Sequence, residues 1–379
     1  MKRKLNIFAG DKALWVIFFL LSGISLIAVY STIGLSAISE QDATPMHVFF
    51  KHLGLVLLTY VAIVIQSHIN YRFFSKISCC AFYISLILLL VVMFTGGARW
   101  LEIPHLPRFQ PSEIAKVALM VFLARSIAVN HDQIEEKRTF YWLLVPVAVT
   151  CGLIVKENLS TAILIWVSCY LLIFFGGVNK SMWWKGVAVM AIAAVVMFVV
   201  LYFVGDKMDV ARSGTWGHRL QNWLHPNPDE LSQENMARMA VARGEFFGCG
   251  IGSTIHGRLM TQAHNDFIYA IIIEEAGMLA AIAIFALYVL FYFRCIHIAR
   301  HCKGTFGSLS VAGLSTMIFL QALVNMSVAV GVLPVTGQTL PFISFGGTAY
   351  LFMGFGVGVI QSVAADNKKK MKLMNSELR

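Results

Sequence analysis

The chain has few charged residues, and this scarcity excludes an ordinary soluble protein. Charged residues make up 13% of its 379 residues, while 58% are hydrophobic. Strict alternation of polar and apolar residues is absent, which excludes a transmembrane β-barrel; no repeat, coiled coil or low-complexity segment is visible either. What is there is a series of apolar runs of roughly 17 to 25 residues, the length that a helix needs to cross ~30 Å of hydrocarbon. We therefore predict an all-α, polytopic integral membrane protein.

The apolar runs form one membrane domain, 1–379, with no soluble module attached. Ten runs are present, at about 13–33, 48–66, 77–95, 112–129, 141–156, 159–176, 185–204, 266–293, 306–330 and 347–365. The first follows a basic N-terminus, as in a signal peptide, but it is too long for one and lacks a convincing cleavage site. We expect it to be retained as the first span.

Lysine and arginine are distributed unevenly between the two sides of these runs. They gather before the first run, in alternate short loops and in the basic tail 366–379, and such clusters mark the cytoplasmic side. Both termini are therefore expected to be cytoplasmic, with a large extracytoplasmic loop at 205–263 between spans seven and eight. The net charge of +10 comes largely from these residues near anionic lipid, so it is no evidence for nucleic acid.

Cysteine and other metal-ligating residues form no recognisable framework. Of the seven cysteines, Cys249 alone falls clearly in an outward loop, so no disulfide network is predicted. The sequence shows no His/Cys/Asp cluster of the kind that holds a metal. No cofactor is certain, and use of a divalent cation, Mg²⁺ or Mn²⁺, stays open.

Basic residues on the outer side break the charge asymmetry. Arginine suits bidentate contact with phosphate oxygens, so a phosphate-bearing lipid head group is one interpretation. The other is that these residues pair with nearby acids and only fold the long loop. The basic residues at or near the outer face are Arg99, Arg108, Lys116, Lys156, Arg212, Arg219, Arg238, Arg243 and Arg258.

The fourth span begins with RFQPSEIAK, from Arg108 to Lys116, which has the pattern of a helix N-terminus. Glu113 and Lys116 are three residues apart and share one helix face. A charged pair inside a span must face the protein interior or a wet cavity. The pair therefore either lines a polar cavity or locks helices together.

A second polar group lies in the short outward turn between spans five and six, VKENLSTA. It contains Lys156, Glu157, Asn158, Ser160 and Thr161. Asn158 or Ser160 can cap the sixth helix, which explains their residue types. Capping does not explain a lysine and a glutamate so close to the membrane, so a share in the polar cavity is equally open.

Asp266 lies at the outer mouth of the eighth span, in TQAHNDFIYAIIIEEAG. An acid beside His264 at this depth gives up hydration that a plain anchor would keep, which makes Asp266 the first candidate for chemistry. The alternative is a helix N-cap, and the two roles are compatible. Glu274 would lie ~12 Å deeper along a straight helix. With Glu275, it is expected to make interhelical contacts.

The last outward loop, GVLPVTGQTLPFISFGGTA, combines two prolines with repeated glycines. It is predicted to be a re-entrant or broken-helix segment, because non-helical backbone at this depth survives only where it is buried in protein or lines a cavity. Thr336, Gln338, Ser344 and nearby amides can donate to a phosphate, or they can serve simple turn chemistry.

Three of these motifs, RFQPSEIAK, HNDFIYAIIIEEAG and LPVTGQTLPFISFGGTA, closely resemble the SEDS family (shape, elongation, division and sporulation), which includes FtsW and RodA. The resemblance covers essentially all ten spans. It implies a peptidoglycan glycosyltransferase that polymerises lipid II at the outer face of the cytoplasmic (inner) membrane. Such proteins work with a class B penicillin-binding protein, an FtsI-like transpeptidase, and with other division proteins. The stretch ARSGTWGHRLQNWLHP is more similar to FtsW than to RodA, which favours a role in division.

The resemblance also implies roles for single residues. The family's essential acid falls on Asp266, which we expect to be the general base. In the turn before span six, the acid is displaced by one position to Glu157, so a role cannot be carried over there. The family's span-four motif falls on Arg108, Glu113 and Lys116. Together with the loop residues, the set expected to bind substrate or line the cavity is Arg108, Glu113, Lys116, Lys156, Thr161, Arg219, His264, Gln338 and Ser344.

Two rival functions are consistent with the same residues. A lipid II flippase needs polar residues along a path that reaches the cytoplasmic side, whereas a polymerase needs them gathered at the outer mouth. A non-catalytic scaffold for division enzymes predicts that Asp266 tolerates replacement by asparagine.

Overall fold

The computed structural model describes residues 8–39, 45–94, 100–101, 108–204, 213–225, 232–260 and 265–377. Within these ranges the chain is helical, apart from loops and an isolated antiparallel bridge between Leu101 and Phe109. The first helices are α1 (Lys12–Ser39), α2 (Pro45–His68), α3 (Tyr71–Phe94), α4 (Pro111–Val129), the short 3-10 helix η1 (His131–Gln133), α5 (Lys137–Val155) and α6 (Leu159–Phe175). They are followed by α7 (Lys180–Val204), α8 (Ser213–Leu224), α9 (Gln233–Gly244), α10 (His256–Leu259), α11 (Ile268–Arg300), α12 (Thr305–Ala329) and α13 (Thr348–Glu377).

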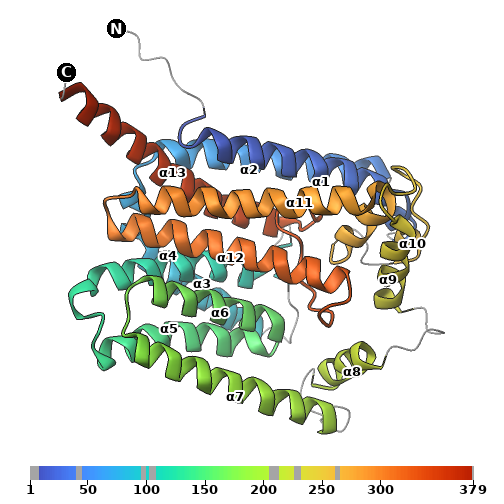
Figure 1. The fold of residues 1–379 in the computed structure, drawn as a ribbon, viewed down its shortest axis with the longest axis horizontal. Coiled ribbons are helices and arrows are strands. Elements are labelled where there is room, and N and C mark those ends of the chain that lie inside the picture. The colour runs from blue at the N-terminus through green and yellow to red at the C-terminus, as the bar shows by residue number, and fades with distance from the viewer. Residues whose placement is uncertain are drawn as a thin grey trace.

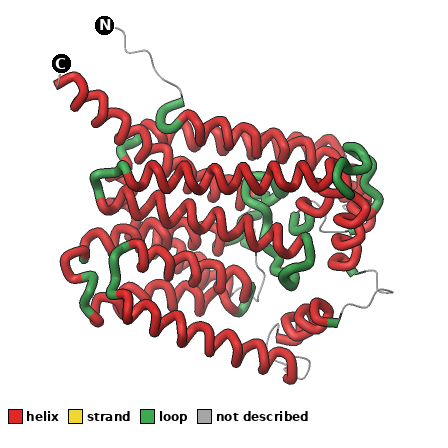
Figure 2. Tube along the Cα trace, in the orientation of Figure 1, coloured by secondary structure: helices red, strands yellow, loops and turns green. Residues whose placement is uncertain are grey.

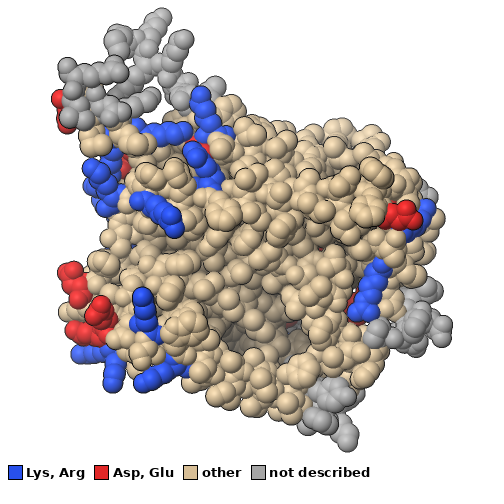
Figure 3. Space-filling model, in the orientation of Figure 1, with Lys and Arg blue, Asp and Glu red and all other residues tan. Residues whose placement is uncertain are grey.

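The long helices lie side by side in one bundle (Figure 1). Eight of the described helices are long and apolar enough to cross a membrane, and α6 is a shorter apolar helix. On the face that Figure 3 shows, charged side chains gather toward the two ends of the bundle and leave an uncharged band between them. The start of α1 and the end of α13 lie at the same end (Figure 1). The predicted all-α, multi-pass membrane fold is confirmed, while the number of ten spans stays a prediction.

The centre of the bundle is α4. Of its 19 residues, 13 are buried, and it packs against α3, α5, α6, α12 and α13. The neighbouring α12 also contacts α6, α11 and α13. Because protein surrounds both helices, any polar side chain on them must pair with protein groups rather than with bulk water. By contrast, the membrane-length stretch of α7 has none of its residues buried.

The segment 205–263, expected as a long outer loop, contains three helices in its described parts. Ser232 is the N-cap of α9, and its side-chain oxygen accepts a hydrogen bond from the Asn235 amide at 3.2 Å. It buries Met236, Ala237 and Ala240 and packs against α11. Helices α9 and α10 lie over the end of the bundle opposite the termini (Figure 1).

The basic tail 366–379 is helical over its described part, because α13 continues as one helix to Glu377. Asn367 is buried, and its side-chain amide donates to the carbonyl of Ile298 in α11 at 3.3 Å. Lys370 and Asp366, one turn apart, form an ion pair at 2.7 Å. Lysine, methionine and leucine are good helix formers, and the tail contains no glycine or proline that would end the helix.

Asp11 joins three helices at the end where α1 begins. Its carboxylate accepts two hydrogen bonds from Arg294 of α11, at 3.0 and 2.7 Å. It also accepts one from the Leu14 amide at 3.2 Å, while the Asp11 amide donates to Gln361 of α13 at 2.7 Å. Burial raises the pKa of Asp11, but the hydrogen bonds from Arg294 and the Leu14 amide outweigh it, so the pKa lies below the ordinary value of 3.8.

Replacing Asp11 by Asn should destabilise the chain by about 1–3 kcal/mol, because Arg294 loses its charged partner. Thermal unfolding of the detergent-solubilised protein measures this change. Because the pKa of Asp11 is lowered in the folded state, its ionised carboxylate stabilises the wild type above about pH 4, and this stabilisation is lost as the pH falls further. The stability of the variant should not show this pH-dependent decrease. Asp366→Asn, which removes an ion pair whose carboxylate is 18% exposed against 4% for Asp11, is the control; an equal loss in both variants would contradict the prediction.

Candidate active site

Glu113 and Lys116 form a buried ion pair near the start of α4. Lys116 Nζ lies 2.8 Å from Glu113 Oε1, and the lysine side chain is 0% exposed. The same ammonium donates to Gln321 Oε1 of α12 at 3.0 Å. The shared helix face expected from the sequence is confirmed. The pair also joins α4 to α12.

Two amides on α12 extend this polar group toward Asp266. Gln321 and Asn325 are four residues apart, so they lie on one helix face, and both are 1% exposed. The Gln321 amide donates to the Thr339 carbonyl at 3.0 Å. The Asn325 amide donates to the carbonyls of Asp266, at 2.9 Å, and Gln338, at 2.7 Å. Helix α12 thus connects the α4 ion pair, the last outward loop and Asp266.

The last outward loop runs among the helices as non-helical backbone (Figure 2). Its residues 340–344 are buried, as predicted for a re-entrant segment. The Ser344 hydroxyl donates to the Asn265 carbonyl at 2.6 Å and accepts from the Leu340 amide at 2.8 Å. Its only proton is therefore used to hold the loop against Asn265. Gln338 donates to Thr161 Oγ1 of α6 at 2.6 Å.

Asp266 lies two residues before α11, whose N-cap residue is Phe267. The alternative that Asp266 is the N-cap of this helix is therefore wrong. Its side chain is half-buried. Gly337 has φ +65°, and a Cβ added there would lie 3.8 Å from Asp266 Oδ2, so the carboxylate faces the re-entrant loop at Gly337. A hollow opens on one face of the molecule, beside the ends of α6 and α12 (Figure 3).

The other residues expected at the site differ in whether they are buried with this cluster or exposed. Thr161 is buried, and its amide donates to Asn158 Oδ1 at 3.1 Å, so Asn158 caps α6. Arg219 of α8 donates to the Val335 carbonyl in the re-entrant loop at 3.3 Å. Arg108, just before α4, and Lys156, at the end of α5, are exposed. The expectation for His264 falls outside the described residues.

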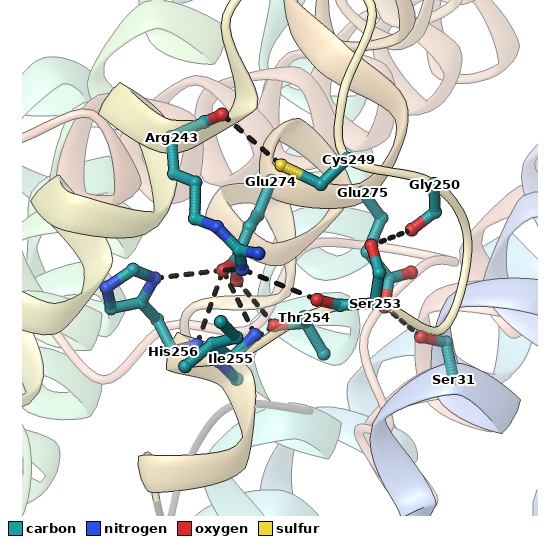
Figure 4. A network of polar contacts seen from close by, with 11 residues as sticks. Ser31, Arg243, Cys249, Gly250, Ser253, Thr254, Ile255, His256, Glu274 and Glu275 are labelled. Carbon is teal, nitrogen blue, oxygen red and sulfur yellow. Dashed lines mark hydrogen bonds and ion pairs between the residues drawn. The ribbon is translucent and has the colours of Figure 1, made fainter.

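Glu274 holds the described part of the segment 205–263, named the outer segment below, onto α11 (Figure 4). Its carboxylate accepts hydrogen bonds from Arg243 at 2.8 Å and from the His256 ring at 2.9 Å, and also from the Thr254 hydroxyl. The amides of Ile255 and His256 donate to the same group, at 3.1 and 3.3 Å. Arg243 therefore forms an ion pair within the protein. For this arginine, the alternative that the outer basic residues pair with acids and fold the long loop is confirmed.

Gly277 divides α11 into two helices. Its φ of +81° is a conformation that favours glycine, and a Cβ there would lie 2.3 Å from the Phe246 carbonyl. The Tyr269 hydroxyl donates to the Ala281 carbonyl at 3.0 Å, twelve residues along the chain. In a straight helix these residues would be ~18 Å apart, so the chain folds back at Gly277. Because Glu274 lies just before this fold-back and contacts Arg243 and His256, the expectation that it lies deeper in a span than Asp266 is wrong.

Sequence reasoning missed Gln321 and Asn325. The available signal was two amides, one helical turn apart, inside an otherwise apolar span. Polar residues within a span face the bundle interior and find partners there. Which partners they find, two backbone carbonyls beside Asp266 among them, depends on how the re-entrant loop and residues 265–266 meet α12.

Fold and site together define a polytopic helical membrane protein with a buried polar cluster near one end and an acid, Asp266, within it. The family model described as a cell cycle protein, FtsW/RodA/SpoVE, matches residues 11–369. The chain belongs to this family, which confirms the resemblance to SEDS proteins.

Relatives of two kinds are similar over nearly the whole chain. The peptidoglycan glycosyltransferase MrdB of Escherichia coli K12 is 29% identical, over 91% of this chain and 92% of its own. A probable peptidoglycan glycosyltransferase FtsW of Trichlorobacter lovleyi is 27% identical, over 94% of each. A solved chain from a peptidoglycan synthase complex that coordinates polymerization and crosslinking shares the fold, with a TM-score of 0.74, 22% identity and coverage of 95% and 98%. RodA of Thermus thermophilus gives 0.67, with 19% identity and coverage of 97% and 99%.

Replacing Lys116 by Met should destabilise the chain by ~3–5 kcal/mol, because Glu113 is left as a buried charge without its cation. Adding Glu113→Gln removes that charge, so the double variant should recover most of the loss. Thermal unfolding in detergent of the wild type, both single variants and the double variant gives the coupling energy. Losses that simply add would show that the two side chains do not interact.

Replacing Glu274 by Gln should loosen the outer segment without unfolding the bundle. The Cys249 and Gly250 amides donate to the carbonyls of Glu274 and Glu275, both at 2.9 Å. We expect hydrogen exchange at these two amides to rise by about tenfold or more, because the segment loses its charged anchor. Glu245→Gln, an exposed acid of the same segment, is the matched control; unchanged exchange in Glu274→Gln would contradict the role.

Proposed function

We propose that this chain is a peptidoglycan glycosyltransferase. It extends glycan strands from lipid II, a disaccharide carried on polyprenyl pyrophosphate, at the outer face of the cytoplasmic membrane. Family membership supports the reaction, and relatives of both kinds are named for it. The observation that carries the assignment is the half-buried carboxylate of Asp266, whose backbone is held by Asn325 and whose Oδ2 faces Gly337.

In the proposed reaction, Asp266 is the general base. Its carboxylate takes the proton from the 4-hydroxyl of the acceptor sugar as that oxygen attacks the anomeric carbon of the donor. The bond from that carbon to the pyrophosphate breaks, and polyprenyl pyrophosphate leaves. A single displacement inverts the anomeric configuration and forms no covalent sugar intermediate. Because the leaving group is already an anion, no general acid is required.

Positive charge near the leaving group is best supplied by residues that a ligand can reach from solvent. Lys116 is paired with Glu113 and bonded to Gln321, so its charge is largely offset. Arg108 and Lys156 are exposed, which leaves their side chains accessible to a pyrophosphate. We therefore assign leaving-group contact to Arg108 and Lys156, and the structural role of joining α4 to α12 to Lys116.

A divalent cation stays a prediction. No three His, Cys, Asp or Glu side chains converge on one point in the part of the chain that the structure describes. Mg²⁺ commonly binds through one or two carboxylates together with substrate phosphates and water, a mode that needs no such cluster. In such a site, Asp266 would provide the carboxylate and the lipid pyrophosphate would provide the phosphate oxygens.

The position of the buried charges favours the polymerase over the flippase. Glu113 and Lys116 lie in the first turns of α4. Further along this helix, the buried side chains are apolar: Val117, Leu119, Met120, Val121, Leu123 and Ile127. A lipid head group crossing the membrane needs polar contacts along its whole path, and the buried charges of α4 are confined to one end.

The cellular role is a choice between cell division and cell elongation. Relatives named FtsW and MrdB match at 27–29% identity, so similarity alone favours neither division nor elongation. We propose division on the FtsW-like stretch around Trp216 and Arg219. The proposed partner is a class B penicillin-binding protein that cross-links the new strands, and the similar fold of a chain from a synthase complex that coordinates polymerization and crosslinking supports coupling of this kind.

Asp266→Asn should abolish glycan polymerisation, with a loss of at least ~100-fold, because the acceptor hydroxyl loses its base. The test supplies labelled lipid II to the purified chain with its partner transpeptidase and measures strand length. Asp132→Asn, an exposed acid between α4 and α5, is the control and should keep wild-type activity.

Strands of equal length from wild type and Asp266→Asn would overturn the base assignment and favour a scaffold. No strands from the wild type, together with transfer of lipid II across vesicle membranes, would favour the flippase instead. Unfolding is separated from loss of chemistry by the thermal midpoint, which should be nearly the same in both proteins.

A further inference from the structure

A groove runs along the surface between α3 and α5, far from the Asp266 cluster. Its volume is about 650 Å³, a size typical of small-molecule sites. Phe82 of α3 and Phe122 of α4 stack in it, with ring centroids 4.4 Å apart and an interplanar angle of 12°. Tyr83 and Trp142, 60% and 66% exposed, also line it. The groove uses the second half of α4, whereas Glu113 and Lys116 lie in the first.

The length of the groove matches one leaflet of a bilayer. Along α5 its lining runs from Arg138 to Val149, a rise of ~17 Å. This is about half of the ~30 Å hydrocarbon thickness. Pro146 lies on the same wall, inside α5. Proline removes one helical hydrogen bond and bends the helix, so the wall that α5 forms is curved.

The two ends of the groove differ in polarity. At the α4–α5 turn the lining includes Asn130, Gln133, Glu136 and Arg138, and beyond Trp142 the lining of α5 is apolar. Glu136 and Arg138 are exposed, and neither side chain has an ion-pair partner within the described ranges. An amphipathic ligand therefore fits with its polar group at the turn and its apolar part toward the middle of the membrane.

The charges at the turn indicate the kind of head group. Residues 131–138, HDQIEEKR, contain three acidic and two basic side chains besides one histidine. Such a mixed turn does not favour a purely anionic lipid. A head group that carries both a phosphate and an ammonium matches it, because Arg138 can bind the phosphate and Glu136 the ammonium.

We propose that this groove is a binding site for one zwitterionic aminophospholipid. The head group lies at the α4–α5 turn, with phosphate on Arg138 and ammonium on Glu136, and an acyl chain covers Phe82 and Phe122. The site is independent of the proposed glycosyltransferase reaction. It places a specific lipid against α4, the helix whose other end carries the Glu113–Lys116 pair.

Native mass spectrometry of the delipidated full-length chain, titrated with phosphatidylethanolamine or phosphatidylglycerol, tests the site. We expect one phosphatidylethanolamine per chain, bound about tenfold more tightly than phosphatidylglycerol. Arg138→Gln should weaken binding by about tenfold, through loss of a charge-assisted hydrogen bond. Val149→Trp and, independently, Val145→Trp fill the apolar part and should reduce binding at least as much. Both valines are at least 46% exposed, so the bulkier side chain does not disturb the core.

Two substitutions outside the groove serve as matched controls. Lys185→Gln removes an exposed cation near the start of α7, and Tyr141→Ala removes an aromatic ring of α5 that is 64% exposed and does not line the groove. Both should bind as the wild type does. Equal affinity for the two lipids would overturn the head-group assignment. Wild-type affinity in both tryptophan variants would show that the lipid binds elsewhere.

Discussion

A buried lysine that must find its counter-charge organises this bundle. Lys116 is 0% exposed on the central helix, where neither lipid nor apolar side chains can replace its water. Glu113 at 2.8 Å and Gln321 at 3.0 Å replace it instead. Between purely apolar helices in lipid there is little preference for one register, because lipid tails are as apolar as leucine. The ion pair and its amide partner set the rotation of α4 against α12.

The position of Asp266 follows from that register. Asn325 lies one turn beyond Gln321 and holds the carbonyls of Asp266 and Gln338 together. Beyond Asp266, the short helix that ends at Gly277 is fixed by Glu274, which binds the outer segment at Arg243. The base role proposed for Asp266 needs such support on both sides, since small displacements from the productive geometry lower the rate sharply.

Much of this arrangement could be predicted from local patterns. The apolar runs indicate the spans, the three-residue spacing predicts the Glu113–Lys116 pair, and the prolines of the last loop predict a buried, non-helical segment. The fold-back at Gly277 could not be predicted, because an isolated glycine in an apolar run is compatible with a continuous helix. Neither could the partner of Arg243, since Glu274 is 31 residues away and several acids lie nearer in sequence.

The sequence by itself determined the class of protein and its family and indicated Asp266 as the candidate acid, because these depend on run lengths, residue types and short motifs. Only the tertiary structure decided which residues meet. It placed Gln321 and Asn325 between the α4 pair and Asp266, turned Ser344 toward Asn265, and moved Glu274 from the depth of a span to the anchor of the outer segment. The physical reason is that a polar group away from water must pair, and its partner is set by the chain path rather than by distance in sequence.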